Sequence, residues 1–205
     1  MPSTYQELKD AVIAFANNQV IEQSLDTFID LCEADISRRV RHWRMEKRAT
    51  ADLDSQYTSL PTDFLEPLRM SITSSTTFAL EPASTQEIAL KRQRASDTAS
   101  RPRLYTILDE TIEVWPKPDI TYTLQMVYYG RVDALSSGNT TNWLLTYFPD
   151  ALLYGTLLHA APFMGEDQRI QVWSSLYDKA VEAINQDSQN AKFGGSGLRM
   201  KMRSY

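Results

Sequence analysis

The sequence has very few of the residues that build reactive centres. It holds one cysteine, Cys32, which excludes an internal disulfide, and two histidines, His42 and His159, which leaves too few ligands for a zinc site of cysteine and histidine. The same scarcity leaves few ways to pair a nucleophile with a base. The phosphate-loop, dinucleotide-binding, metalloprotease and nucleophile-elbow motifs do not occur. We therefore expect no enzyme, no metal and no cofactor.

Long hydrophobic runs are missing as well. No stretch approaches the roughly 18 uncharged apolar residues of a spanning helix, and the N-terminus lacks the basic segment and apolar run of a secretory signal. The 205 residues, 42% of them hydrophobic, are enough for one domain with a sizeable core. The net charge of −5 argues against a surface that grips nucleic acid everywhere. We expect a protein without membrane contact, soluble when made in a reducing cytoplasm.

Two helices are predicted at the N-terminus. Residues 3–17 begin with a capping-box pattern and carry apolar residues at helical spacing until Asn17. Residues 24–48 hold one apolar stripe over about five turns, the most regular pattern in the chain.

A β-rich insertion is predicted from about residue 55 to residue 130. Its segments are short, rich in β-branched and aromatic residues, and separated by prolines. Residues 104–108 and 111–115 form the best hairpin candidate, with Asp109 and Glu110 at the turn, and residues 120–132 continue it as a third strand. The insertion is therefore expected to be a small antiparallel sheet lobe.

The helices resume at residues 143–163, which are apolar on every side. A helix of this kind must be surrounded. Residues 166–188 follow directly, with one apolar face, so the two segments form an αα-hairpin around Gly165. The patterns together predict a mainly α protein with a β insertion (α+β), built as a bundle of about four helices in a single domain, 1–190.

The middle of the all-apolar helix contains candidate contact residues. Small side chains there let neighbouring helices approach closely, and the single histidine is expected to be a core or interface residue. The positions that we assign to the core or to a contact between subunits are Tyr154, Gly155, Leu158 and His159.

A basic run, residues 38–48, is the one charge cluster with a possible function. On a helix, Arg41, Arg44 and Arg48 fall on one face, with Arg38 one turn earlier. Such a face is typical either of a solvated helix end or of a surface that meets phosphates or an acidic partner.

The last segment, residues 191–205, predicts a flexible basic arm. Glycines precede the stretch LRMKMR, where apolar and basic residues alternate with the period of a strand. A lone strand cannot bury its apolar face, so it suits pairing with another chain, while a disordered terminus is the other interpretation. The candidate binding residues are Leu198, Arg199, Met200, Lys201, Met202, Arg203 and Tyr205.

The order of these parts resembles a known family. The segments YFPDALLYGTLLHAAPFMGEDQRIQVWSSLYDKAVEAINQ, the preceding TNWLL and the earlier LPTDFLEPLRMSI are similar to those of the head-to-tail adaptor (connector) proteins of tailed bacteriophages. The helical hairpin is the specific part of the resemblance, and together the segments cover most of the chain.

The resemblance implies a structural virion protein, made in the host bacterial cytoplasm and placed at the head-tail junction. It implies a homo-oligomeric ring of about twelve copies beneath the portal protein, joined through two different patches of each subunit. The ring would extend the channel through which genomic DNA passes without sequence-specific binding, and a tail or nozzle protein would attach to it. By the same resemblance, residues 198–205 would be the portal-binding arm.

Two other classes of protein stay open at this point. A DNA-binding regulatory or packaging-associated protein would use the basic helix 38–48, although the helix-turn-helix spacing is a poor match. A hydrolase would need an acid/base pair that includes His159.

Overall fold

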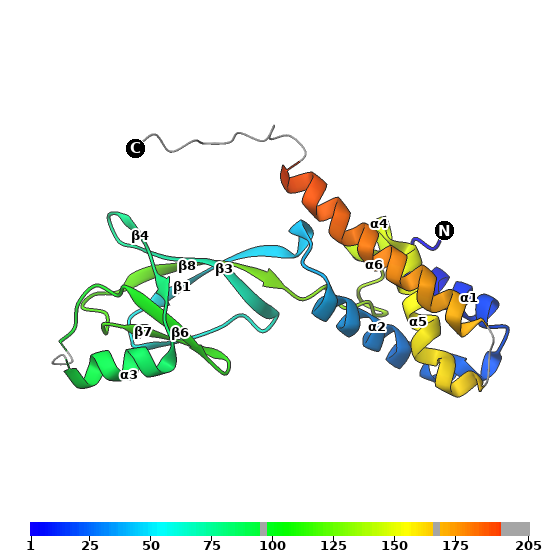
Figure 1. The fold of residues 1–205 in the computed structure, drawn as a ribbon, viewed down its shortest axis with the longest axis horizontal. Helices are drawn as coiled ribbons and strands as arrows, with labels where there is room; N and C mark the ends of the chain where they lie inside the picture. The colour runs from blue at the N-terminus through cyan, green and yellow to red at the C-terminus, as the bar shows by residue number, and fades with distance from the viewer. Residues whose placement is uncertain (95–97, 166–168, 194–205) are drawn as a thin grey trace. The chain divides into compact units, whose positions relative to one another are not determined.

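The chain divides into two compact units. The computed structural model describes residues 1–94, 98–165 and 169–193. The helical unit combines Met1–Met45 with the chain from Val132 onward, and the β-rich unit is Glu46–Arg131 (Figure 1). The expected fold class, mainly α with a β insertion, is confirmed. The insertion forms a unit of its own and begins at Glu46, earlier than the predicted residue 55.

The helical unit begins with a short capped helix. The Thr4 side chain accepts a hydrogen bond from the Glu7 backbone N–H, and Asn17 ends the helix in the left-handed conformation, with φ 52°. The elements of the unit are α1 (Tyr5–Ala16), the 3₁₀ turn η1 (Gln19–Ser24), α2 (Leu25–Arg39), the 3₁₀ turn η2 (Trp43–Met45), α4 (Trp143–Tyr147), α5 (Pro149–Met164) and α6 (Ile170–Phe193).

The predicted helix 24–48 is wrong beyond Arg39. Val40 is extended, and residues 46–53 form strand β1, which pairs along its whole length with β8. Apolar residues recur in the sequence past Arg39 because the loop that follows the helix is also partly buried and needs apolar side chains. The ladder with β8 then decides the conformation, since tertiary pairing overrides a weak helix propensity.

Helix α5 is the centre of the helical unit, and α1, α2, α4 and α6 all pack against it (Figure 1). The chain's own helices therefore explain why the segment is apolar on every side. The predicted single helix 143–163 is two helices, because Phe148 leaves the helical conformation (φ −136°, ψ 54°) directly before Pro149. A proline disfavours the helical region for the residue that precedes it, and it begins the next helix well.

Helix α6 runs five residues beyond its predicted end at residue 188. It continues through Phe193, because the sequence offers no glycine until position 194. The predicted first turn, with Glu166 and Asp167, lies outside the described residues.

The β-rich unit consists of two four-stranded sheets and one helix. The first sheet has the order β1-β8-β3-β4 and the second has the order β2-β7-β6-β5, in which β5 and β6 alone are parallel among the described strands. The elements are β1 (Glu46–Leu53), β2 (Tyr57–Ser59), β3 (Phe64–Thr73), β4 (Thr77–Ala79), β5 (Glu81–Pro82), α3 (Thr85–Arg94), β6 (Leu104–Leu108), β7 (Thr111–Trp115) and β8 (Tyr122–Gly130).

The predicted hairpin of β6 and β7 is confirmed, with Leu108 opposite Thr111 across the turn. The predicted third strand of a meander is wrong, because β8 pairs with β1 and β3 rather than with β7. Pro116 and Pro118 separate β7 from β8 and do not suit a tight hairpin turn. The inward side chains of β8 instead join residues of both sheets in one hydrophobic core.

Candidate functional site

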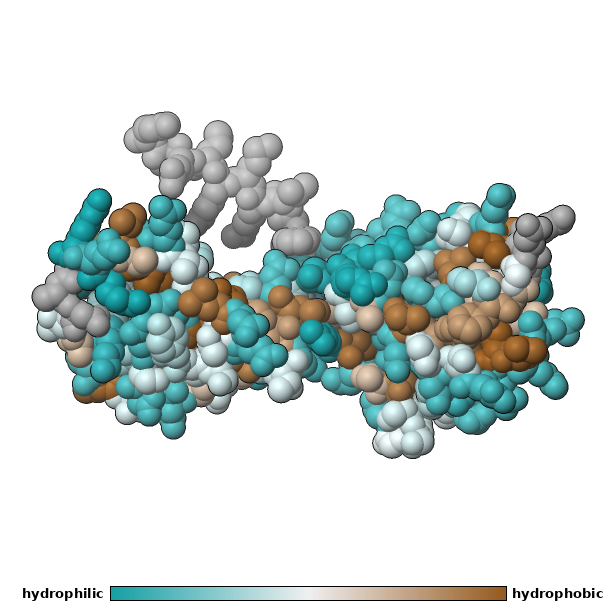
Figure 2. All heavy atoms as spheres, turned by 90° about the horizontal axis from the view of Figure 1, so that it is seen from below, coloured by the Kyte–Doolittle hydropathy of each residue, from teal (hydrophilic) through white to brown (hydrophobic). Residues whose placement is uncertain are grey.

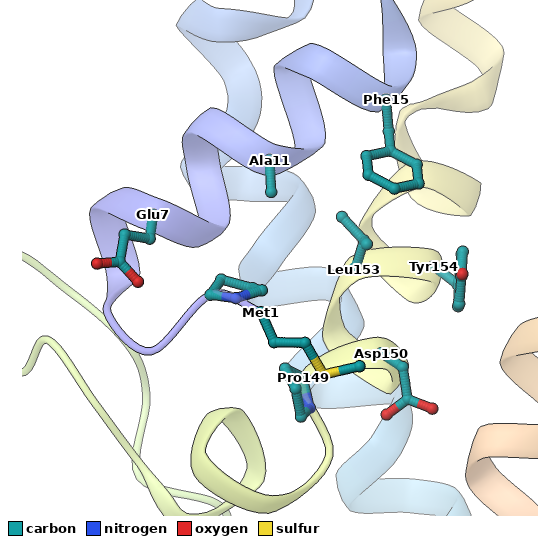
Figure 3. A pocket seen from close by; sticks show the side chains of 9 residues that line it. Met1, Glu7, Ala11, Phe15, Pro149, Asp150, Leu153 and Tyr154 are labelled. Atoms are coloured by element: carbon teal, nitrogen blue, oxygen red, sulfur yellow. The ribbon is translucent and has the colours of Figure 1, made fainter.

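The helical unit has an apolar groove on its surface. It lies between α1 and α5 and has a volume of about 490 Å³. Figure 3 shows Ala11 and Phe15 of α1 facing Leu153 of α5, with Met1 across the end near Pro149. On the face drawn in Figure 2, apolar residues also gather over the helical unit, at the right of the picture. A concave apolar surface of this kind suits a protein contact.

Phe15 of α1 contributes an exposed aromatic side chain to the groove. Its side chain is 49% exposed, although it belongs to an amphipathic helix whose other face is buried. Its backbone carbonyl accepts a hydrogen bond from Arg169 Nη1 at 2.9 Å. The last turn of α1 is therefore held by Arg169, the residue directly before α6, while the Phe15 ring stays exposed.

Two carboxylates border the groove. Glu7 Oε2 accepts hydrogen bonds from the Ser3 backbone N–H and the Ser3 hydroxyl, both at 2.8 Å, and these bonds lower the pKa of Glu7. Asp150 lies in the first turn of α5, where the helix dipole favours an acid. The rim is negative, so a partner with an apolar core and a basic edge would fit it.

The candidate residues of α5 do not form one surface. Tyr154 lines the groove, while Leu158 and His159 are half-buried. Gly155 lies in the core, where a Cβ atom would collide with the Cys32 sulfur of α2 and would lie 2.8 Å from Tyr177 Cε2 of α6. The small residue therefore serves the packing of three helices inside one chain.

The structure does not form the single helix that was predicted to carry the basic residues 38–48. Arg38 pairs with Asp35 at 3.3 Å, Arg41 donates to the Ser37 and Val40 carbonyls at 2.8 Å, and Arg48 belongs to strand β1. A helix that ends at Arg39 cannot align them.

Arg44 has a different environment from the one that the sequence suggested. Its guanidinium lies over the Trp43 ring at 4.3 Å and over the Tyr147 ring at 3.8 Å. Cation–π contacts on two rings hold the side chain in place at the end of the helical unit.

A buried histidine anchors the segment that leaves the helical unit. His42 is fully buried, stacks on Trp143 with ring centroids 4.8 Å apart, and places Nε2 2.9 Å from Asp187 Oδ2. His42 Nδ1 accepts the Arg44 backbone N–H at 3.2 Å, which leaves Nε2 as the donor to Asp187. Burial lowers the pKa of His42, and Asp187 opposes this shift. The group is a structural anchor that sequence reasoning missed, because His42 stands in a run that reads as basic and exposed.

A buried acid anchors the segment that returns from the β-rich unit. Glu33 accepts the Leu135 backbone N–H at 3.2 Å and Asn142 Nδ2 at 2.9 Å. Asn142 also caps α4 through the Leu145 N–H at 2.8 Å. Burial raises the pKa of Glu33 to about 7, and the two hydrogen bonds only partly offset this effect.

This raised pKa predicts a pH-dependent stability. Between the ordinary pKa of 4.5 and about pH 7, Glu33 keeps its proton in the folded protein but loses it in the unfolded chain. The folded state is therefore stabilised most, relative to the unfolded chain, below pH 4.5, and this stabilisation is lost as the pH rises toward 7. Glu33→Gln removes this titration and keeps an acceptor oxygen. Urea unfolding gives the free energy of unfolding of both proteins. The value for the variant minus the value for the parent should rise by on the order of 2 kcal/mol between about pH 5 and about pH 8. A difference that does not change with pH would contradict the assignment.

The proposed arm, residues 198–205, lies outside the described residues. Within the described part of the chain, no group of three or more histidine, cysteine or acidic side chains is placed to hold a metal ion. No helix among the described residues is both long and apolar enough to cross a bilayer.

Comparison with known protein families places the chain beside one described family. A family model described as SU10 adaptor protein matches residues 3–200, so it spans both units and reaches into the basic tail. A search of curated proteins found no match.

Proposed function

The chain belongs to the SU10 adaptor protein family, which confirms the resemblance to phage adaptors, and from this we propose that it forms a ring beneath the portal. A phage adaptor is a structural protein of the virus particle, and the family is not a class of enzymes. In the proposal, the ring extends the channel that carries the DNA and gives the tail its attachment surface. The observation that carries it is the match over both units.

The apolar groove supports assembly into a ring. A closed ring uses heterologous contacts, in which one patch of a subunit meets a different patch of the next. The groove between α1 and α5 is one candidate patch, and the exposed Phe15 and the half-buried Tyr154 are its aromatic residues. In this proposal an adjacent subunit covers the groove.

The alternative of a DNA-binding regulator has lost its basis. It required a basic helix at residues 38–48, and the helix ends at Arg39. We do not propose it further.

Light scattering tests the proposed function. The purified chain is mixed with a portal ring from the same virus, and the mass of the product is compared with the masses of the two components. We expect one large complex whose added mass is a whole number of chains, about twelve. If the two components keep separate masses at every ratio, the proposal fails.

Phe15→Lys should weaken assembly on the portal without unfolding the chain. A lysine suits the last turn of a helix but cannot be buried in an apolar contact. We expect the protein concentration at half-assembly to rise about tenfold, which corresponds to about 1.4 kcal/mol. Leu31→Lys is the matched control, since Leu31 is 46% exposed on α2 and does not line the groove. Equal behaviour of the two variants would remove the groove from the interface.

A further inference from the structure

The β6–β7 hairpin carries opposite charges at its two ends. Leu104 pairs with Trp115 at the open end, and Leu108 pairs with Thr111 at the turn. Arg101 and Arg103 precede β6 at the open end, while Asp109 and Glu110 form the turn. Four residue steps along a strand span about 14 Å, so the ends are separate surfaces of one rigid element.

The open end is a cationic pocket of about 550 Å³ that includes Lys91, Arg101 and Arg103. The Arg101 guanidinium lies 3.9 Å from the centre of the Phe78 ring, and its buried Nε has no hydrogen-bond partner. Within the described residues, neither Arg101 nor Arg103 forms an ion pair, and one acid, Glu81, also lines the pocket. Among the described residues that line it, the pocket therefore has an excess of positive charge.

The backbone around this pocket is fixed. The Arg103 N–H donates to the Trp115 carbonyl at 3.0 Å, and the Arg103 carbonyl accepts the Glu81 N–H at 2.9 Å. Lys91 Nζ lies 5.6 Å from the centre of the Trp115 ring and 3.5 Å from Glu87. The cations are therefore presented from the end of a sheet rather than from a free loop.

The turn end is an exposed acidic tip. Asp109 has φ 53°, a left-handed conformation that aspartate tolerates in turns, and both carboxylates are exposed. The Glu110 carbonyl accepts the Leu60 N–H at 2.8 Å, which holds the tip against the residue that follows β2. Arg131 lines the same hollow, yet in the described residues it makes no ion pair with the tip.

We propose that the acidic tip of one copy enters the cationic pocket of the next copy, head to tail. The inference rests on the proposed function, because it supplies a ring contact that uses two different patches. Each exposed ion pair alone contributes little, but repetition around a ring adds the contributions together.

Charge distribution favours a second copy over DNA as the partner. Residues 87–103 hold five basic and two acidic residues, whereas the rest of the β-rich unit holds five basic and ten acidic ones. An extended polyanion would meet repulsion from this surrounding surface. A turn with two carboxylates is short enough to contact only the pocket and not the acidic residues elsewhere on the unit.

Disulfide trapping tests the contact, because the one native thiol, Cys32, is fully buried. The full chain carrying Arg103→Cys and Glu110→Cys is oxidised mildly, alone and on the portal ring. The two new cysteines cannot bridge within a chain, because a disulfide needs Cα atoms within about 7 Å. We expect covalent ladders of three or more copies, fewer of them at about 1 M salt. An equimolar mixture of the two single variants should stop at dimers.

The matched control is Arg48→Cys with Asp52→Cys, which removes the same charges from exposed positions of β1. It should give no ladder. The inference is overturned if the test pair stays monomeric in both settings or gives no more ladder than the control. Portal binding, measured in the same samples, separates the two proposals. If the chain binds the portal but forms no cross-links, only the tip-and-pocket contact is refuted. If cross-links form but the chain does not bind the portal, only the proposed function is refuted.

Discussion

Gly155→Val should unfold the helical unit at moderate urea concentrations. The added side chain would collide with the Cys32 sulfur and with the Tyr177 ring, whose Cε2 would lie 2.8 Å from the new Cβ. These neighbours belong to α2 and α6, which both pack against α5 at this glycine, so the added side chain has to push two helices away from α5. We expect a loss of about 3 kcal/mol or more in the free energy of unfolding, at the upper end of what overpacking costs.

The measurement is urea unfolding followed by circular dichroism, with Gly138→Val as the control. The nearest atom to a Cβ at Gly138 is the Ser136 hydroxyl oxygen at 3.9 Å, an ordinary contact, so that variant should unfold close to the parent. Gly155→Ala should lie between the two. A Gly155→Val protein as stable as its parent would show that the three helices do not pack as described.

Removing the basic tail should abolish binding to the portal. A chain that ends at Phe193 keeps the whole of α6 and loses the basic residues Arg199, Lys201 and Arg203. Because the tail alternates apolar and basic side chains, a partner can bury one face and pair with the other. We expect affinity to fall by at least about a hundredfold, close to 2.7 kcal/mol, while the unfolding curve stays that of the full chain.

Two substituted tails separate the contributions to portal binding. Replacing Leu198, Met200 and Met202 by serine removes the apolar face, and replacing the three basic residues by glutamine removes the charge. Both should weaken binding, and only the charged face should make binding sensitive to salt. Undiminished binding by the chain that ends at Phe193 would refute the role of the arm.

The sequence predicted the helical elements well where local pattern and packing agree. The segment around Leu152 and Leu157 is apolar on every side, and the structure buries both residues completely among neighbouring helices. The β6–β7 hairpin was also predictable, because an acidic turn separates two short β-rich runs. In both cases the information lies within a few residues.

Other features depend on partners far away in the chain. Arg48 lies on a strand because its segment pairs with β8, about 80 residues later, and no local pattern separates that strand from a continued helix. The same holds for β8, which leaves the hairpin to join β1 and β3. Long-range pairing is the part of a fold that periodicity describes least.

The candidate contact surfaces were only partly predictable. Tyr154 was a candidate and lines the groove, but Phe15 stands at the helical spacing of the apolar residues in 3–17, and that spacing does not distinguish it from the buried ones. The cationic pocket was missed because Arg101 and Arg103 stand in a polar segment that reads as a loop. A clustering of five basic residues within residues 87–103, in an otherwise acidic insertion, was the signal that could have found it.

The most direct test of the account is an electron cryomicroscopy map of the head-tail junction of the intact virus particle. The account predicts a ring of this chain directly below the portal, with the helical unit recognisable by α5 surrounded by α1, α2 and α6. A junction that contains no copy of the chain, or copies placed elsewhere in the particle, would contradict it.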